Sequence, residues 1–286
     1  MTIAVTGATG QLGRLIIAGL KTKVEAEQII AVVRNASKAK DLGVSVREAD
    51  YTEPAKLLEA FQGVDTVMLI SGTDMGHRIA QHRNVIEAAK AAGVKHIVYT
   101  SLLHAERSPL SLGVEHRATE VDIKASGIPF TILRNGWYFE NQTASIPGAL
   151  AGGAFIGSAG DGKFSSATRA DYAEAAVTVL TQAGHNGQIY ELAGDEAHTL
   201  TDLAAEISRQ TGRTIPYKNL AGKEFAAALL GFGLPEMFAN AVAEWDVKAS
   251  QNALYDTSKQ LSKLIGHPTT PLATAVAAAL QPVAKS

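Results

Sequence analysis

The chain of 286 residues contains no cysteine. That absence excludes disulfides, thiolate nucleophiles, zinc ribbons and iron–sulfur clusters together. An excess of basic residues is also missing, because 26 Lys and Arg stand against 28 Asp and Glu, a formal net charge of −2. A general basic surface that would hold nucleic acid through counterion release is therefore not expected. We predict no nucleic-acid partner.

Long hydrophobic runs are missing as well. No apolar stretch approaches the roughly 18 residues that a membrane span needs, and the first residues lack the basic-then-apolar order of a signal peptide. The histidines show no metal-ligand spacing, since there is no H-E-x-x-H and His77 and His82 are five residues apart. We therefore expect a cytoplasmic protein with no membrane partner and no metal site.

The first half of the chain alternates strand-like apolar runs with segments of helical periodicity. The expected strands are residues 3–5, 29–33, 44–47, 66–70, 96–100 and 130–133. Such alternation implies parallel strands joined by right-handed helical crossovers. The predicted fold class is α/β, a Rossmann-type doubly wound parallel sheet, with a cofactor expected across the carboxyl ends of its strands.

The pattern changes after Asn135. The glycine-rich residues 147–162 predict a long functional loop, residues 188–192 predict another strand, and the chain is mostly helical from Thr199 onward. We interpret residues 1–136 and 162–192 as the Rossmann domain. Residues 137–161 and 193–286 are then a smaller, mainly helical C-terminal substrate lobe.

A glycine-rich turn follows the first expected strand and opens a segment with helical apolar spacing. It reads Gly7-Ala8-Thr9-Gly10-Gln11-Leu12-Gly13. Glycines let such a turn reach positive φ, and they let the backbone approach a pyrophosphate held on the N–H groups of the helix. The sequence predicts a dinucleotide site here; the alternative is a tight strand-to-helix turn without a ligand.

The end of the second strand indicates which dinucleotide is bound. An NAD site places an acidic residue about 20 residues beyond the glycines, but this chain has Arg34 there. A guanidinium suits a 2′-phosphate, so we predict NADPH, with mere solvation of the strand end as the alternative. Asp50, just past the third strand, is expected to meet the adenosine; an Asp in that place is also a common N-cap.

Several stretches together carry a family resemblance. They are the glycine turn, Arg34-Asn35, Ala49-Asp50-Tyr51, Ala91-Ala92-Gly93-Val94-Lys95-His96, Tyr99-Thr100-Ser101 and Leu133-Arg134-Asn135-Gly136-Trp137-Tyr138. They resemble the NmrA-like atypical short-chain dehydrogenases, and within that family the bacterial NADPH:quinone oxidoreductase 2 type, with the triphenylmethane dye reductases near by. The likeness covers nearly the whole chain.

The resemblance implies that the Rossmann domain binds NADPH. It assigns the cofactor to the glycine turn, Arg34, the end of the fourth strand and a stretch beside the nicotinamide. The implied residues are Gly7, Ala8, Thr9, Gly10, Gln11, Leu12, Arg34, Ser71, Gly72, Thr73, Asn135, Gly136, Trp137, Tyr138, Phe139 and Glu140.

The proton-donating residues of ordinary short-chain dehydrogenases are missing. Those enzymes reduce carbonyls with a serine after the fifth strand and a Tyr-x-x-x-Lys on the next helix. This chain keeps Ser101 but has His116 and Glu120 in place of the tyrosine and lysine. An acidic group cannot lower the pKa of a phenol as lysine does, so we expect no carbonyl reduction by that mechanism.

A quinone needs less help, because hydride addition to its ring gives a resonance-stabilised anion of modest basicity. We predict an NADPH-dependent quinone oxidoreductase with direct two-electron hydride transfer. It would need no flavin, since the nucleotide fingerprint is already used by NADPH. Trp137, Tyr138 and Phe139 form either an apolar wall for the quinone or ordinary core. His104, His116 and Tyr138 are the catalytic candidates, although a histidine more often has a structural partner.

Two other functions stay open. NmrA-like proteins include redox-sensing regulators that bind NAD(P) without turning it over, and the fold does not distinguish them from enzymes. Triphenylmethane dyes and azo compounds also accept hydride without a strong acid. The expected partner is a small-molecule quinone, and a homodimer is the default oligomer.

Overall fold

The computed structural model describes residues 1–281, which divide into two compact units. The first unit comprises Met1–Glu106, Leu112–Asn135 and Arg169–Leu192. The second comprises Arg107–Ser111, Gly136–Thr168 and the described chain from Ala193 onward. The division differs from the predicted one in placing residues 107–111, 136 and 162–168 in the second unit. Residues 282–286 of the predicted lobe lie outside the described residues.

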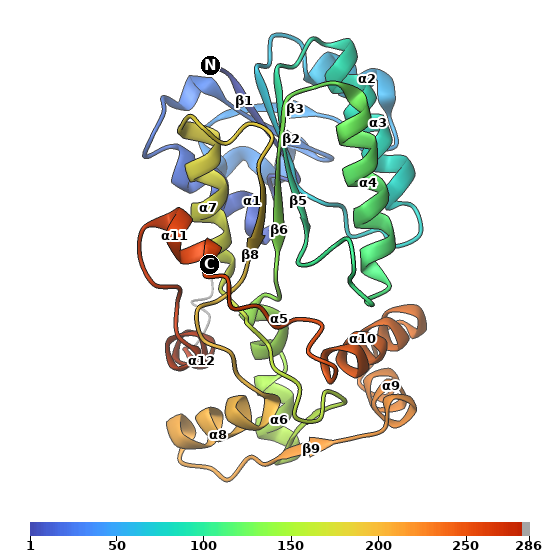
Figure 1. The fold of residues 1–286 in the computed structure, drawn as a ribbon, viewed down its shortest axis with the longest axis vertical. Helices are drawn as coiled ribbons and strands as arrows, with labels where there is room; N and C mark the ends of the chain where they lie inside the picture. The colour runs from blue at the N-terminus through green and yellow to red at the C-terminus, as the bar shows by residue number, and fades with distance from the viewer. Residues whose placement is uncertain (282–286) are drawn as a thin grey trace. The chain divides into compact units, whose positions relative to one another are not determined.

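The first unit is built on a seven-stranded sheet whose strand order is β3-β2-β1-β4-β5-β6-β8 (Figure 1). All neighbouring pairs are parallel, which confirms the predicted doubly wound α/β fold. The strands are β1 (Ile3–Thr6), β2 (Ile29–Val33), β3 (Ser45–Glu48), β4 (Thr66–Leu69), β5 (His96–Leu102), β6 (Phe130–Asn135) and β8 (Ile189–Leu192).

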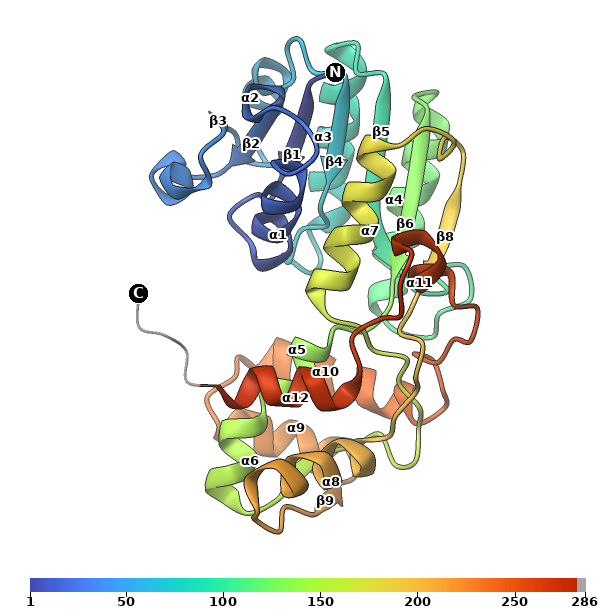
Figure 2. The ribbon, with the colours of Figure 1, turned by 90° about the vertical axis from the view of Figure 1, so that its left-hand side faces the viewer.

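Helices cover both faces of this sheet, with α1 and α7 on one face and α2, α3 and α4 on the other (Figures 1 and 2). Strands β1, β2 and β4 are buried at every position, as expected for a parallel sheet covered on both sides. The helices are α1 (Gln11–Leu20), α2 (Pro54–Ala60), α3 (Arg78–Ala91), α4 (Leu112–Ser126) and α7 (Arg169–Thr181), with short 3-10 helices η1 (Ala26–Gln28) and η2 (Ala36–Leu42).

One glycine sets the spacing between α1 and α7. A Cβ on Gly19 would lie 2.8 Å from Cγ2 of Val177, closer than real Cβ contacts come. Glycine costs helix stability at an interior position, about 1 kcal/mol relative to alanine. Here it lets the two helices that cover one face of the sheet pack closely near the end of α1.

The second unit is mainly helical, with one small parallel pair of strands. Helix α10 packs on α9, and α12 packs on α5 and α8. Its elements are α5 (Phe139–Thr143), α6 (Ile146–Gly152), β7 (Phe155–Gly157), α8 (Leu200–Thr211), β9 (Tyr217–Asn219), α9 (Gly222–Gly231), α10 (Glu236–Ala249), α11 (Gln260–Ile265) and α12 (Leu272–Leu280). Within the described residues, no helix combines the length and the apolar character that crossing a membrane requires.

The predicted long loop at residues 147–162 is wrong, because α6 and β7 lie there. Pro147 occupies the first turn of α6, where its missing N–H costs nothing, and Gly153 ends the helix in the left-handed conformation. Phe155 is then buried and pairs with Tyr217 of β9. The glycines therefore mark the end of a short helix and do not form a continuous loop.

Candidate functional site

The glycine turn has the close packing that a dinucleotide site requires. Gly7 has a φ of +60°, and the N–H of Gly10 donates to the carbonyl of Gly7 at 2.9 Å. A Cβ on Gly13 would overlap the carbonyl oxygen of Gly7 and lie 2.8 Å from Cα of Ala8. Only glycine fits at position 13, so the first turn of α1 lies directly against the loop and its N–H groups are presented there.

Tyr51 joins the strand ends beneath this turn. Its hydroxyl lies 2.5 Å from Oγ1 of Thr6 and 2.9 Å from the carbonyl oxygen of Ile70, so the ends of β1 and β4 and the loop after β3 meet at one phenol. Burial raises the pKa of Tyr51 above its usual value. The phenol is therefore a neutral structural group under the glycine turn.

Arg34 and Asp50 lie at neighbouring strand ends. Nε of Arg34 is 4.0 Å from a carboxylate oxygen of Asp50, and the Arg34 side chain is 83% exposed. Asp50 accepts hydrogen bonds from the N–H and hydroxyl of Thr52 at 2.8 and 2.7 Å. Burial alone would raise the pKa of Asp50, but these hydrogen bonds and Arg34 outweigh it and hold the pKa below its usual value. The structure thus brings an exposed guanidinium and an ionised carboxylate together.

A buried neutral histidine holds the loop after β4, which contains Ser71, Gly72 and Thr73. The N–H of Gly72 donates to Nε2 of His82 at 2.9 Å, and Nδ1 of His82 lies 3.0 Å from Oγ1 of Thr119. Since Nε2 accepts, the ring proton is on Nδ1. Burial lowers the pKa of His82 to about 3, which keeps the ring in this form. Sequence reasoning assigned no role to His82.

An ionic group lies at the other half of the sheet, near the carboxyl ends of β5, β6 and β8. Arg134, whose side chain is only 5% exposed, contacts three carboxylates. Its Nε and Nη2 donate to Glu120 at 2.9 and 2.7 Å, Nη1 donates to Glu191 at 2.8 Å and Nη2 to Glu106 at 3.0 Å. We call Arg134 and these three glutamates the Arg134 cluster. Sequence reasoning missed it; a charged residue inside an apolar strand is the signal that could have revealed it.

The register of the sheet explains how the Arg134 cluster forms. Ser101 of β5 is opposite Arg134 of β6, and Arg134 is opposite Glu191 of β8. Glu120 comes from α4 and also accepts from the hydroxyl of Ser101 at 2.6 Å. The serine that ordinary short-chain dehydrogenases use with a tyrosine is therefore bonded to a buried, arginine-paired carboxylate.

The two histidine candidates of this unit have different surroundings. His116 is buried, and its Nδ1 lies 2.7 Å from the hydroxyl of the fully buried Tyr99. Burial, with Arg78 near by, lowers the pKa of His116 well below its usual value. His104 follows the end of β5 with a φ of +54°, and its N–H donates to Oε2 of Glu191 at 2.7 Å. The structure thus gives His116 a buried structural partner and leaves His104 at the carboxyl edge of the sheet.

Asn135 ends β6 in the first unit, while the stretch that follows it opens the second. Phe139 is buried and stacks on His198 with ring centroids 5.1 Å apart, as a core aromatic does. Trp137, Tyr138 and Glu140 are half-buried, whereas Gly136 is buried like Phe139. Trp137 packs edge-to-face on Trp245 at 5.8 Å. Of the three aromatic candidates, Trp137 and Tyr138 keep exposed surface.

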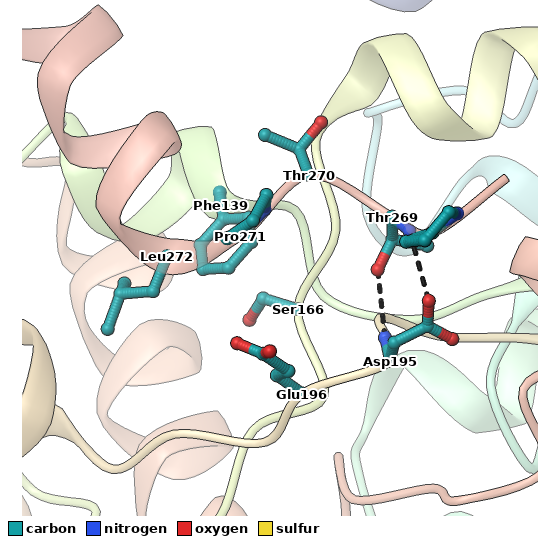
Figure 3. Close-up of a pocket in the computed structure, with 9 residues that line it drawn as sticks. Phe139, Ser166, Asp195, Glu196, Thr269, Thr270, Pro271 and Leu272 are labelled. Atoms are coloured by element: carbon teal, nitrogen blue, oxygen red, sulfur yellow. Dashed lines mark hydrogen bonds between the residues drawn. The ribbon is translucent and has the colours of Figure 1, made fainter.

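A small pocket of about 70 Å³ lies within the second unit. Figure 3 shows Phe139, Ser166 and Glu196 on its walls, and Asp195 beside Thr269. Asp195 accepts from the N–H of Thr269 at 3.0 Å and donates its own N–H to Oγ1 of Thr269 at 2.9 Å. The volume is well below the roughly 300 Å³ at which ligand pockets begin. Across residues 1–281, no group of three or more His, Asp or Glu side chains is placed to hold a metal ion.

Comparison with known proteins agrees with this geometry. The family described as NAD(P)H-binding matches residues 7–183. The chain is 58% identical over 277 residues to quinone oxidoreductase 2 of Escherichia coli K12, covering 96% of this chain and 97% of that protein.

Solved structures agree as well. An E. coli NADPH-dependent quinone oxidoreductase complexed with NADPH matches with a TM-score of 0.96 and 57% identity, covering 98% of this chain and 100% of that one. A Citrobacter triphenylmethane reductase complexed with NADP(H) matches with a TM-score of 0.94 and 42% identity, covering 98% and 100%. With the glycine turn closed as a dinucleotide requires and the match spanning most of the first unit, the chain belongs to the NAD(P)H-binding family.

Proposed function

We propose that this chain is an NADPH-dependent quinone oxidoreductase that transfers two electrons as a hydride, without flavin or metal. The observation that carries the proposal is the similarity to E. coli quinone oxidoreductase 2 over nearly the full length of both chains. The regulator alternative has no comparable support, because the NmrA structure itself is only 18% identical and speaks for the fold alone.

The first unit fits NADPH at the glycine turn, where position 13 has room only for glycine. Gly7, Ala8, Thr9, Gly10, Gln11 and Leu12 would hold the pyrophosphate on main-chain N–H groups. Arg34 would hold the 2′-phosphate and Asp50 the adenosine. The nicotinamide half is assigned to Ser71, Gly72, Thr73 and Asn135 in the first unit, and to Gly136, Trp137, Tyr138, Phe139 and Glu140 in the second. NADPH, when bound, supplies the hydride.

The Arg134 cluster supports a quinone over a simple carbonyl as the acceptor. Reduction of a carbonyl yields a strongly basic alkoxide, which needs a proton from a tuned acid. Ser101 and Glu120, which stand where two of the usual residues would be, are bonded to each other and to Arg134. A quinone yields a weakly basic anion, so the loss of the tyrosine and lysine is tolerated.

The assay that tests this function follows NADPH oxidation by absorbance, with and without a benzoquinone, on protein stripped of flavin and metal. We expect quinone-dependent oxidation that prefers NADPH to NADH. Tight NADPH binding without turnover would reject the enzyme and favour a regulator. A second candidate, reduction of triphenylmethane dyes, is favoured by the 42% identity to the Citrobacter reductase and is tested in the same cuvette.

We also propose that the second unit is the substrate lobe and that the protein is a cytoplasmic homodimer. Light scattering on the purified protein tests the dimer, and cell fractionation tests the compartment. A monomeric mass would reject the dimer while leaving the enzymatic proposal intact.

A further inference from the structure

The main chain at His104 adopts a conformation that non-glycine residues rarely take. His104 has a φ of +54° and lies two residues beyond Leu102, the last residue of β5. Such conformations are strained, and they persist only where the surroundings hold them. The carboxyl ends of parallel strands are also where ligands of doubly wound sheets bind. His104 therefore combines strain with a ligand-facing position.

Glu191 holds this histidine at two points. Its Oε2 accepts the N–H of His104 at 2.7 Å and lies 3.6 Å from Nδ1 of the ring. The His104 side chain is 13% exposed, so the ring is neither sealed in the core nor loose in solvent. Because Nδ1 is turned toward the carboxylate, Nε2 lies on the far side of the ring. A carboxylate on one imidazole nitrogen is the usual way to orient the other nitrogen toward a reacting group.

Arg134 in turn fixes Glu191. Nη1 of Arg134 donates to the other oxygen of Glu191 at 2.8 Å, and the two residues are opposite each other on β6 and β8. Arg134 is itself fixed by Glu120 through two hydrogen bonds. A continuous chain of contacts therefore runs from α4 through Arg134 and Glu191 to His104.

The charges around His104 come from several elements. Glu106, Glu120 and Glu191 supply three carboxylates, against Arg134 and Lys124, whose Nζ lies 3.8 Å from Glu120. Arg117 adds a further cation, with Nη1 donating to the carbonyl of Ala105 at 2.9 Å. Among these groups, Glu191 is the carboxylate that lies 3.6 Å from the His104 ring.

We propose that His104 is the proton donor that completes quinone reduction, and that Glu191, fixed by Arg134, is its positioning residue. The inference rests on the proposed function. A hydride carrying two electrons passes from NADPH to the quinone ring, which leaves NADP⁺ and the hydroquinone monoanion. The His104 imidazolium then gives a proton to that oxyanion, and the neutral imidazole regains a proton from water.

The choice of acceptor separates proton donation from any other role. Hydride addition to a benzoquinone requires a proton, whereas addition to a cationic triphenylmethane dye gives the neutral leuco product and requires none. His104→Asn is the first variant, because asparagine tolerates positive φ and keeps the N–H that Glu191 accepts. We expect kcat with benzoquinone to fall about tenfold, less than the loss of a general acid usually costs, because the hydroquinone anion is only weakly basic, with the dye rate within about twofold of wild type.

His104→Gly provides a second test. Glycine adopts a φ near +54° at no steric cost, so the loop keeps its conformation while the imidazole is lost. We expect added imidazole to restore part of the quinone rate and to leave the dye rate unchanged. Glu191→Gln keeps an acceptor for the His104 N–H but loses the charge, and we expect kcat for quinone to fall by less than in His104→Asn, at unchanged KM.

The control is His96→Asn, at the amino end of the same strand, where Nε2 of His96 contacts Oγ1 of Thr131 at 3.0 Å. We expect it to keep both rates. The NADPH dissociation constant, measured by fluorescence, should match wild type in every variant.

Equal loss of both rates in His104→Asn, a full quinone rate, or no rescue by imidazole would each overturn the inference while leaving the proposed function standing. A wild-type protein that oxidises NADPH with dye but not with quinone would instead reject the proposed function. If wild type reduces quinone but not the dye, the test is the rescue of His104→Gly: restoration of the quinone rate by imidazole supports the inference, and no restoration overturns it.

Discussion

The two halves of the sheet hold their carboxyl ends by different kinds of contact. Around the glycine turn after β1 the groups are neutral: glycine main chain and the Tyr51 hydroxyl. The loop after β4 is held by the unprotonated Nε2 of His82 and by the pair of the buried Arg78 with Glu115, in which Arg78 donates to the carbonyl of Gly72. Around β5, β6 and β8 they are ions: Arg134 against Glu106, Glu120 and Glu191. A neutral surround leaves the positive end of α1 available to an anionic ligand, whereas the ionic group holds three carboxylates on one arginine. One half presents charge to a ligand, and the other uses charge to fix its own side chains.

Removing the Arg134 cation should strongly destabilise the ionic half of the sheet. Arg134→Met leaves Glu120, which is 3% exposed, with only the partly exposed Lys124 at 3.8 Å as a cation, and loss of a buried ionic partner costs about 3–5 kcal/mol. We expect a matching drop in the free energy of unfolding, measured in urea. The double variant Arg134→Met with Glu120→Leu should recover part of it, because no carboxylate then stays buried at that point. A single variant as stable as wild type would contradict the ionic account.

Adding one methyl group should break the neutral half. In Gly13→Ala the new Cβ overlaps the main chain of Gly7 and Ala8, so the turn must open. We expect a loss of about 1–3 kcal/mol in stability and NADPH binding weakened by more than about tenfold, measured by fluorescence titration. Gly148→Ala is the matched control, because its Cβ meets nothing within 4 Å. Unchanged NADPH affinity in Gly13→Ala would remove the dinucleotide site from this turn.

Arg34→Ala tests the one exposed cation that the neutral half is proposed to offer a ligand. We expect the dissociation constant of NADPH to rise about tenfold, or about 1.4 kcal/mol, with that of NADH unchanged, because NADH lacks the 2′-phosphate. Lys at the same position should retain part of the preference. If the NADPH constant stays the same, Arg34 does not select the cofactor.

Acid should affect the neutral half through His82. Its pKa in the folded protein is lowered to about 3, below the ordinary value of 6.5. Between these two pH values the unfolded chain therefore binds a proton at His82 that the folded chain does not bind. The stability that this provides is complete above pH 6.5 and is lost as the pH falls toward 3. Between pH 7 and 5.5 we expect the free energy of unfolding to fall by about 1 kcal/mol less in His82→Gln than in wild type. Urea unfolding at each pH measures the difference. Equal pH slopes in both proteins would contradict this.

The neutral half was largely predictable, because its signals are local. Gly7, Gly10 and Gly13 fall within seven consecutive residues beside an apolar strand, and six strands of the sheet were located in the first half of the chain. The ionic half was not, since Arg134 meets a glutamate 14 residues earlier in the chain and another 57 residues later. A charged residue inside an apolar strand signals that Arg134 needs partners, but only the register of β5, β6 and β8 determines which side chains they are.

The residue that holds His104 is made long after His104 itself. Glu191 lies on β8, 87 positions further along, and the chain enters the second unit and returns before that strand is added to the sheet. A nascent chain ending near Asn135 would lack both α7, which covers α1, and the acid that orients the histidine. Because domains generally fold as units, the first unit is completed only after residues 136–192 have been synthesised. On the ribosome, the histidine would therefore be positioned last.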